Sequence, residues 1–311
     1  MTTAASAAMA PVPLVTAVLV CWNHERFLEA AVLSAVRQTH ADIQLIVIDN
    51  GSTDGSQAKL ETLAAEHGFA LVCQGNVGLV RALNQALAMA RGKYFAALAT
   101  DDVWLLDKTA KQVAFLEANP GVDLVSGQIA GIDAEGRPLD VPVVVRPGEV
   151  TFADLMAHGG FIYGPTMMCR VETLRAMGGY DESLRIEDYS IALKFAHEGR
   201  RLVVLPDVLT HYRRHGNNWT AGSIDPDIAA IGEKYRGTPE YRAFYQRSFP
   251  MEFWQLVRDG RKREAWRVLL NEPVRWDWNN VGRGLLRMPI PYSLIRAFRA
   301  LRGSATPDRV A

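Results

Sequence analysis

Short, continuously apolar segments alternate over the first hundred residues with segments whose apolar side chains recur at helical spacing. The apolar segments have the composition of buried strands and are residues 15–20, 45–48, 70–73 and 93–98. The helical segments between them are residues 25–38, 56–67 and 79–90. Strands that alternate with helices of this length form a mostly parallel sheet with helices on both faces. The pattern therefore predicts an α/β protein with a Rossmann-like, doubly wound sheet.

Three of the predicted strands end in small clusters of polar and aromatic residues. The clusters are Trp22-Asn23, Asp49-Asn50 and Asp101-Asp102. Open parallel sheets bind their ligands in the crevice outside the carboxyl ends of the strands. We therefore expect the three clusters to meet in one ligand site. Further along the chain, the sequence predicts helices over residues 108–117, 171–177 and 187–197, strands over 124–130 and 202–205, and a glycine-rich loop over 159–166.

The two aspartate-containing clusters have a functional and a structural interpretation. Asp101 and Asp102 are paired carboxylates that can hold a hard divalent cation bridging diphosphate oxygens. The alternative is a helix cap or a solvated turn, where Asp is common. The strand before the pair and Trp104 after it favour the cation. Asp49 and Asn50 can hydrogen-bond a uracil or thymine edge or a ribose hydroxyl, or can form a turn that precedes a helix cap.

Two later clusters carry groups suited to acid–base chemistry and to phosphate binding. Glu187 and Asp188 open a predicted helix, where one of them can act as a general base towards an acceptor hydroxyl or both can cap the helix. Two histidines and two arginines follow a predicted strand: His211, Arg213, Arg214 and His215. Imidazole can ligate a metal and guanidinium can neutralise a diphosphate, although a histidine is often only a packing residue.

In this order, the motifs resemble those of family 2 glycosyltransferases. The resemblance begins in residues 15–55, with Trp22-Asn23 and with the run Asp49-Asn50-Gly51-Ser52-Thr53-Asp54-Gly55. It continues through Asn76-Val77-Gly78, Asn84, Gly92, Ala99-Thr100-Asp101-Asp102, Gly178-Gly179-Tyr180-Asp181-Glu182 and Glu187-Asp188. The resemblance covers about residues 13–218. It implies a GT-A fold and an inverting enzyme that transfers a sugar from a nucleotide-diphosphate sugar to an acceptor hydroxyl.

The resemblance also implies a role for each of these residues. The nucleotide part of the donor would contact Trp22, Asn23, Asp49, Asn50 and Asp101. Asp102 and His215 would hold Mn²⁺ or Mg²⁺, and Asp188 would be the catalytic base. Weaker expectations, for the diphosphate or the acceptor, fall on Glu187, Arg213, Arg214 and Trp104.

The chain departs from the family pattern at two of these positions. Many members have a second Asp where this chain has Asn50, and many have an Asp where this chain has Ala99. Asn50 can still donate and accept hydrogen bonds, but it makes the preferred base less certain. With Ala99, metal binding would rest mostly on Asp102, and Asp101 would lie nearer the ribose or the sugar.

The expected partners are a nucleotide-sugar donor and a saccharide, a glycolipid or another hydroxyl acceptor, as in the synthesis of envelope polysaccharide. UDP- and dTDP-sugars are favoured by the resemblance. Equal numbers of basic and acidic residues, 34 of each, give no reason to expect nucleic-acid binding. Sugar nucleotidyltransferases are a rival class, but they usually carry a glycine-rich basic loop that residues 21–25 lack. A catalytically inactive binding protein of the same fold is the other rival, and the joint presence of Asp101, Asp102 and Asp188 argues against it.

The cysteines and the apolar runs indicate the compartment. Cys21, Cys73 and Cys169 lie far apart in apolar sequence without metal-site spacing, so we predict buried, reduced thiols in a cytoplasmic protein. No apolar run reaches the roughly 18 residues that span a bilayer.

Three segments are expected along the chain: a disordered leader over residues 1–12, a catalytic domain over 13–223 and a helical extension over 224–311. Residues 281–311 contain six Arg and one acidic residue among apolar side chains. A basic amphipathic stretch of this kind can rest on an anionic membrane, which would place the protein at the inner face. Alternatively, it packs on the catalytic domain or on a second subunit of a homo-oligomer.

Overall fold

The computed structural model describes residues 14–140, 146–159, 162–216, 225–245, 247–248, 260–261 and 263–264. The chain divides into two compact units, Met1–Tyr241 and Arg242–Ala311, and every helix and strand named below belongs to the first unit. The expected leader over residues 1–12 and the basic segment over residues 281–311 lie outside the described residues.

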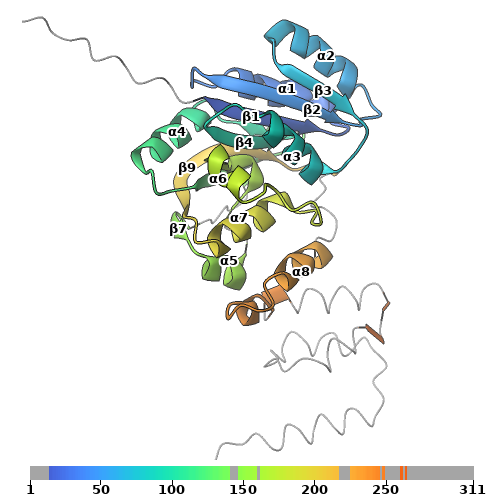
Figure 1. The fold of residues 1–311 in the computed structure, drawn as a ribbon. Coiled ribbons are helices and arrows are strands. Elements are labelled where there is room, and N and C mark those ends of the chain that lie inside the picture. Colours follow the sequence, from blue (N-terminus) through green and yellow to red (C-terminus); the bar gives the residue numbers. More distant parts are fainter. Residues whose placement is uncertain are drawn as a thin grey trace, which may run out of the picture. The chain divides into compact units, whose positions relative to one another are not determined.

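Four parallel strands form the first half of the sheet, as predicted. They are β1 (Val15–Cys21), β2 (Ile43–Asn50), β3 (Ala70–Gln74) and β4 (Tyr94–Ala99), in the spatial order β3-β2-β1-β4. Cys21 lies opposite Asp49 in the β1–β2 pair, and Val20 lies opposite Ala99 in the β1–β4 pair. The carboxyl ends of β1, β2 and β4 therefore meet at one edge of the sheet (Figure 1).

The second half of the sheet is mixed rather than parallel. It contains β5 (Val103–Trp104), β6 (Leu124–Ile132), β7 (Gly148–Val150), β8 (Met168–Arg170) and β9 (Leu202–Arg213). β8 pairs antiparallel with β4 and with β6, whereas β6 and β9 are parallel. β5 and β7 each pair antiparallel with β9. The predicted strands at 124–130 and 202–205 are confirmed, but β5, β7 and β8 were not predicted, because strands of two or three residues show no periodicity.

β9 is much longer than the sequence predicted. The apolar run ends at Leu205 and is followed by Pro206, and a proline normally argues against a central strand. The pairing of β9 with β6 is irregular there, because the register shifts on both sides of Gln128. Beyond this bulge the strand resumes and continues to Arg213. The continuation brings the histidine- and arginine-rich segment to the edge of the sheet where β4 ends.

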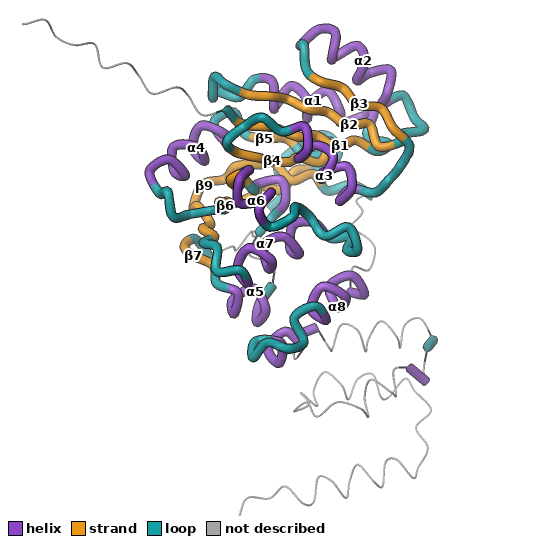
Figure 2. The backbone as a smooth tube through the Cα atoms, in the orientation of Figure 1, coloured by secondary structure: helices purple, strands orange, loops and turns teal. Residues whose placement is uncertain are grey.

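Helices cover both faces of the sheet (Figure 2). The longer helices are α1 (Glu25–Val36), α2 (Ser56–His67), α3 (Leu79–Met89), α4 (Lys108–Ala118), α7 (Glu187–His197) and α8 (Asp225–Glu233). The shorter ones are α5 (Phe152–His158), the 3-10 turn η1 (Gly164–Thr166) and α6 (Val171–Ala176). α1, α2 and α4 pack on one face, and α3 packs on the other, as does the start of α7.

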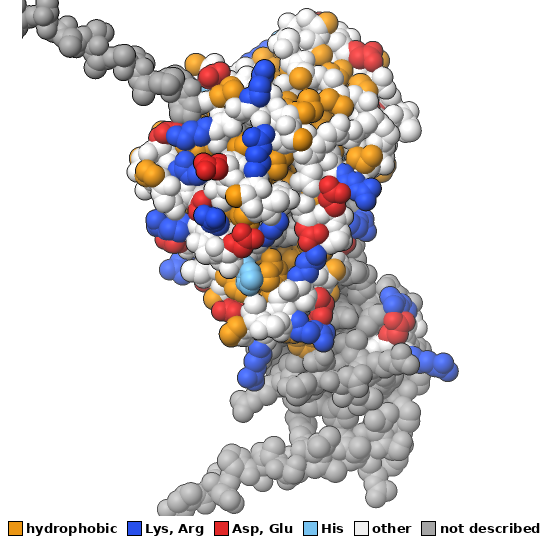
Figure 3. All heavy atoms as spheres, in the orientation of Figure 1, with side chains coloured by type: hydrophobic (Ala, Val, Ile, Leu, Met, Phe, Trp, Pro, Cys, Tyr) orange, Lys and Arg blue, Asp and Glu red, His pale blue; other side chains and the backbone are white. Residues whose placement is uncertain are grey.

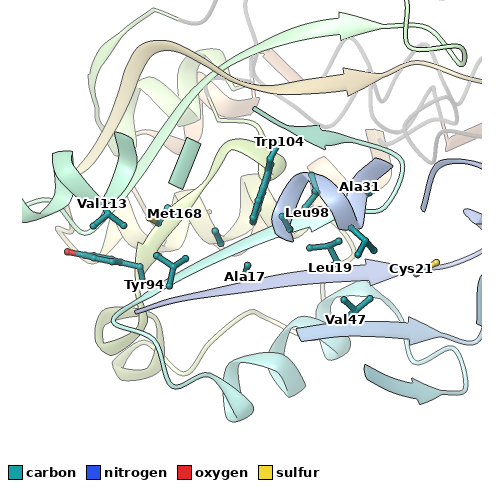
Figure 4. Packing of buried hydrophobic residues seen from close by; sticks show 14 of the residues in the cluster. Ala17, Leu19, Cys21, Ala31, Val47, Tyr94, Leu98, Trp104, Val113 and Met168 are labelled. Atoms are coloured by element: carbon teal, nitrogen blue, oxygen red, sulfur yellow. The ribbon is translucent and has the colours of Figure 1, made fainter. Parts of the chain in front are cut away.

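Strand alternation produces this two-faced packing. Ala17, Leu19 and Cys21 point to one face of β1 and pack with apolar residues of α1, α2 and α4 (Figure 4). Val20 points to the other face, towards α3. Both faces of the strand are thus buried, which explains its continuous apolar sequence.

The predicted burial of the three cysteines holds for two of them. Cys21 and Cys169 are buried as predicted, but the prediction for Cys73 was wrong, because β3 is the edge strand and leaves this thiol exposed.

On the face shown in Figure 3, basic and acidic side chains are interspersed rather than gathered by sign. Within the described residues, no helix has both the length and the apolar character needed to cross a bilayer.

Candidate active site

The loops after β1 and β2 are joined by hydrogen bonds at the carboxyl edge of the sheet. The Asn23 N–H donates to Ser52 Oγ at 2.9 Å, and Asn23 Oδ1 accepts from the Thr53 N–H at 2.7 Å. Asn23 has a φ of 58°, a left-handed conformation that Asn adopts more readily than most residues. Trp22 is 52% exposed beside these loops. An exposed indole on a fixed loop is available for stacking on a planar ligand.

A cluster of two histidines and one aspartate lies at the end of β4. His215 Nε2 is 3.2 Å from Asp101 Oδ2, and His24 Nε2 is 4.0 Å from the same oxygen. One ligand atom from each of the three residues lies within 4.8 Å of the others, a spacing that can hold a metal ion. His24 Nδ1 is 3.0 Å from Thr100 Oγ1, a contact that fixes the ring. Burial lowers the pKa of His24, which favours the neutral imidazole that a metal needs.

Asp102 is not a member of this cluster and binds the end of β9. Its Oδ1 accepts the Arg213 N–H at 2.8 Å. The Arg213 guanidinium donates to the carbonyl oxygens of Asp101 and Asp133, and it also lies 4.8 Å from the centroid of the Phe27 ring. Burial, followed by the charge of Asp101, raises the pKa of Asp102 well above its usual range. Asp102 and Arg213 therefore join β9 to the β4 end.

Asp49 and Asn50, at the end of β2, differ in whether their side chains are fully hydrogen-bonded within the protein. Both polar atoms of the Asn50 side chain are hydrogen-bonded: Oδ1 accepts from Gln74 and from the Val77 N–H, and Nδ2 donates to Asn76 Oδ1. Asp49 Oδ2 accepts the Ser52 N–H at 3.2 Å. Asp49 Oδ1 is the one buried side-chain polar atom in the described residues that lacks a hydrogen-bond partner. A buried acceptor left unpaired is costly, so a ligand donor is favoured there.

Glu187 and Asp188 begin α7 next to the turn η1. Asp188 Oδ1 accepts the Tyr189 N–H at 2.6 Å, and Oδ2 accepts the Gly164 N–H at 3.1 Å. Burial raises the pKa of Asp188, and these two N–H groups act in the opposite direction. Burial, with the charge of Asp188, raises the pKa of Glu187 to about 8. The raised pKa of Glu187 favours its neutral form, whereas the two N–H groups stabilise the charged form of Asp188, so Asp188 is the better candidate for the ionised base.

The remaining expected residues occupy different surroundings. Trp104 is 2% exposed, and its indole N–H donates to the Pro165 carbonyl at 2.8 Å, so it supports η1 from inside the protein. Arg214 is exposed, and its N–H donates to the Ile132 carbonyl. His24 was not singled out from the sequence. Its position directly after the Trp22-Asn23 cluster was the available signal, but no spacing rule links it to Asp101 and His215.

Comparison with known proteins places this chain in a family. The model of the family described as "Glycosyl transferase family 2" matches residues 16–177, just over half of the chain. The proposed glycosyltransferase EpsE of Bacillus subtilis is 29% identical over 70% of this chain and 78% of its own length. A proposed teichuronic acid biosynthesis glycosyltransferase of the same organism, TuaG, is 30% identical over 47% of this chain and 58% of its own length.

Solved structures show the same fold. Residues 1–349 of TarS from S. aureus, in complex with UDP-GlcNAc, superpose with a TM-score of 0.62 at 18% identity, over 76% of this chain and 72% of theirs. In a second TarS structure, with a longer chain, this chain spans 43% of the TarS length. A mannosyltransferase from Pyrobaculum calidifontis, in complex with GDP-Man and Mn²⁺, gives a TM-score of 0.60 at 20% identity, over 93% and 80% of the two chains. The fold is the GT-A fold, and the chain belongs to glycosyl transferase family 2.

Proposed function

We propose that this protein is an inverting, metal-dependent glycosyltransferase that uses a UDP- or dTDP-sugar and a hydroxyl acceptor. The observation that carries the proposal is the meeting of a metal-competent cluster and the half-buried Asp188 carboxylate at the same edge of the sheet. The names of relatives such as TuaG support a saccharide or glycolipid acceptor in envelope polysaccharide synthesis.

Asp101, His24 and His215 would hold the metal in this proposal. Sequence reasoning assigned the metal to Asp102 and His215, whereas the cluster with metal-binding spacing joins His215 to Asp101 and His24. Asp102 Oδ1 instead accepts the Arg213 N–H. Two imidazoles beside one carboxylate suit Mn²⁺ better than Mg²⁺, which prefers oxygen ligands. When bound, the ion would neutralise charge on the leaving diphosphate.

The nucleotide would lie over the ends of β1 and β2. The unpaired Asp49 Oδ1 can accept one N–H, and uracil and thymine both present a single N–H on the edge of the ring. The exposed Trp22 can stack on the same base. Asn50 would act by holding the loop at residues 74–77 in place, since its side chain is already committed to it.

Asp188 would accept the proton of the acceptor hydroxyl during sugar transfer. The acceptor oxygen forms a bond to the anomeric carbon on the face opposite the nucleotide, and the bond from that carbon to the diphosphate oxygen breaks with its electron pair. Burial raises the pKa of Asp188 towards neutral pH, which strengthens it as a base. A single displacement inverts the configuration at the anomeric carbon.

The Asp188→Asn variant tests this assignment because it removes the base and keeps the size of the side chain. We expect sugar transfer to fall by about 10²- to 10⁴-fold, the usual contribution of a general base. Nucleotide affinity should stay unchanged, as measured by calorimetry. Glu187→Gln is the matched control: it replaces the neighbouring carboxyl, whose raised pKa favours the neutral form, so it should retain most of the activity. Turnover that survives in Asp188→Asn would remove Asp188 from this role.

A further inference from the structure

Tyr180 is held in place by its backbone and leaves its side-chain hydroxyl available. Gly178 and Gly179 before it have φ values of 77° and 72°, in the left-handed region that favours glycine. Asn84 of α3 brackets the next residue, because its Oδ1 accepts the Tyr180 N–H and its Nδ2 donates to the Tyr180 carbonyl, each at 2.9 Å. A Cβ on Gly179 would lie 2.6 Å from Asn84 Oδ1, so the close approach also requires glycine.

The ring of Tyr180 is buried, yet its hydroxyl has no hydrogen-bond partner among the described residues. The residue is 8% exposed, and the ring packs at 6.4 Å from the centroid of Phe95. Burial raises the pKa of Tyr180 well above its ordinary value, and nearby Cys169, Glu187 and Asp188 raise it further. The hydroxyl therefore stays protonated and can donate. Asp49 Oδ1 is the only fully buried unpaired side-chain polar atom among the described residues, so the Tyr180 hydroxyl keeps some exposed surface at which it can meet a ligand.

Tyr180 lines a cavity whose walls are otherwise mainly apolar. The cavity has a volume of about 60 Å³, enough for several atoms of the size of a hydroxyl oxygen. Its apolar walls come from β1, β4 and α3 and include Val20, Ala97 and Leu83. Glu187 and Asp188 are its acidic members. A hydroxyl entering this cavity would find few hydrogen-bond partners besides Tyr180 and the two acids.

The position of the cavity relates it to the transferred sugar. Ala99, two residues before Asp101, lies on its wall, and so does Asp188. On the proposed function, on which this inference rests, the diphosphate lies at Asp101 and the base is Asp188. The sugar of the donor must lie between them, because the anomeric carbon is bonded to the diphosphate and is attacked from the side of the base.

We propose that Tyr180 is a substrate-binding residue whose hydroxyl donates a hydrogen bond to a hydroxyl oxygen of the transferred sugar, one edge of which enters the cavity between Ala99 and Asp188. The role belongs to the side chain of Tyr180, whereas Asn84 and the two glycines position its backbone. The substrate class is a donor sugar with a free hydroxyl on the edge that faces α3.

The test compares Tyr180→Phe with wild type in calorimetric binding, in the presence of Mn²⁺. The probes are UDP, dTDP, UDP-glucose, UDP-galactose, UDP-GlcNAc and dTDP-rhamnose. The substitution keeps the ring and its packing and removes only the hydroxyl. We expect affinity for the sugar-bearing donor that wild type binds most tightly to fall about threefold to tenfold, the worth of one net hydrogen bond. Affinity for the free nucleotide should stay the same.

Tyr94→Phe is the matched control. Tyr94 is also a buried tyrosine, but it lies on the opposite face of the sheet, in the cluster of Figure 4. Its hydroxyl is paired with Glu117 at 2.6 Å. This variant should leave donor affinity unchanged.

Equal donor affinity in wild type and Tyr180→Phe would overturn the inference, and so would a wild type in which no donor sugar adds to the affinity of its nucleotide. A rise in the KM of the acceptor alone would also overturn it. Failure of every nucleotide and every donor to bind would instead contradict the proposed function itself.

Discussion

Lys108 is a lysine without exposed surface at the start of α4. Its Nζ donates to Gln112 Oε1 at 2.8 Å and lies 4.2 Å from the centroid of the Trp104 ring. Burial lowers its pKa to about 7. The ammonium and the buried Gln112 lie behind η1, where Gln112 Nε2 donates to the Thr166 carbonyl. The protonation state of Lys108 therefore affects the buried contacts that support η1, the turn beside Asp188.

The stability of the protein should depend on pH through Lys108. Between pH 7 and about 10.4, the unfolded chain keeps the lysine proton and the folded chain loses it. The unfolded state binds more protons in this window, so this residue makes the free energy of unfolding rise with pH. Between pH 7 and pH 9.5, we expect a gain of about 2–3 kcal/mol for wild type relative to Lys108→Met. Urea denaturation of both proteins at the two pH values measures it, and identical pH dependence in the two would contradict the assignment.

Residue identities alone could predict much of the site but not the direction of each side chain. Asp101, Asp102 and His215 were expected together, and the structure does bring their segments together. Which of the two aspartates takes which role depends on which carboxylate accepts the Arg213 N–H. This contact joins residues that are 111 positions apart in the sequence. Likewise, the neighbouring sequence does not predict that the Asn50 side chain hydrogen-bonds to residues 74–77 while Asp49 keeps an unpaired oxygen.

At the level of elements, η1 holds Asp188, the proposed base. Three contacts hold the turn: Trp104 Nε1 donates to the Pro165 carbonyl, Gln112 Nε2 donates to the Thr166 carbonyl, and Ser126 Oγ pairs with Thr166 Oγ1 at 2.7 Å. With η1 held in this way, the Gly164 N–H donates to Asp188 Oδ2. The glycine-rich loop predicted over residues 159–166 ends in this turn, whose supporting contacts come from three other elements.

The Gly164→Ala variant should disturb the acids without disturbing the nucleotide site. Its Cβ would lie 3.1 Å from Glu187 Oε1 and 3.3 Å from Asp188 Cβ, so both side chains must shift by a few tenths of an ångström. Small misplacements of reacting groups are costly, and we expect about a tenfold lower kcat with unchanged nucleotide affinity. Gly121→Ala is the control, because its Cβ would meet only Arg201 Nη1, at 3.4 Å. An unchanged kcat in Gly164→Ala would show that η1 does not position the base.

The elements that sequence could predict are those long enough to show a period. α2 and α7 begin and end at the predicted residues, and β1 to β4 differ from prediction by a few residues at their ends. The missed elements are short strands and the continuation of β9, where tertiary pairing with β6 overrides the proline signal. The part of β9 that the sequence did not predict carries Arg213 and leads to His215, one of the three residues of the metal-competent cluster.

At the scale of the whole molecule, the site is assembled from segments far apart in the chain. Residues 22–24, 49–50, 101–102 and 213–215 converge because three parallel strands end at one edge and β9 returns to it. Asp188 reaches the same region from α7, through η1. The parallel half of the sheet was predictable from the alternation of strands and helices, and with it the convergence of the first three segments, whereas the mixed half was not.

Nucleotide binding with and without Mn²⁺ tests the central claim most directly. The variants are Asp101→Asn and Asp102→Asn, a matched pair, since Asn at 102 can still accept the Arg213 N–H and keep β9 in place. We expect UDP or dTDP with Mn²⁺ to stabilise wild type against thermal unfolding, by about 2.7 kcal/mol at a hundredfold excess over Kd. Asp101→Asn should lose the metal-dependent part and Asp102→Asn should retain it. Stabilisation that needs no metal, that persists in Asp101→Asn, or that no nucleotide produces would contradict the proposed metal-dependent sugar-transfer site.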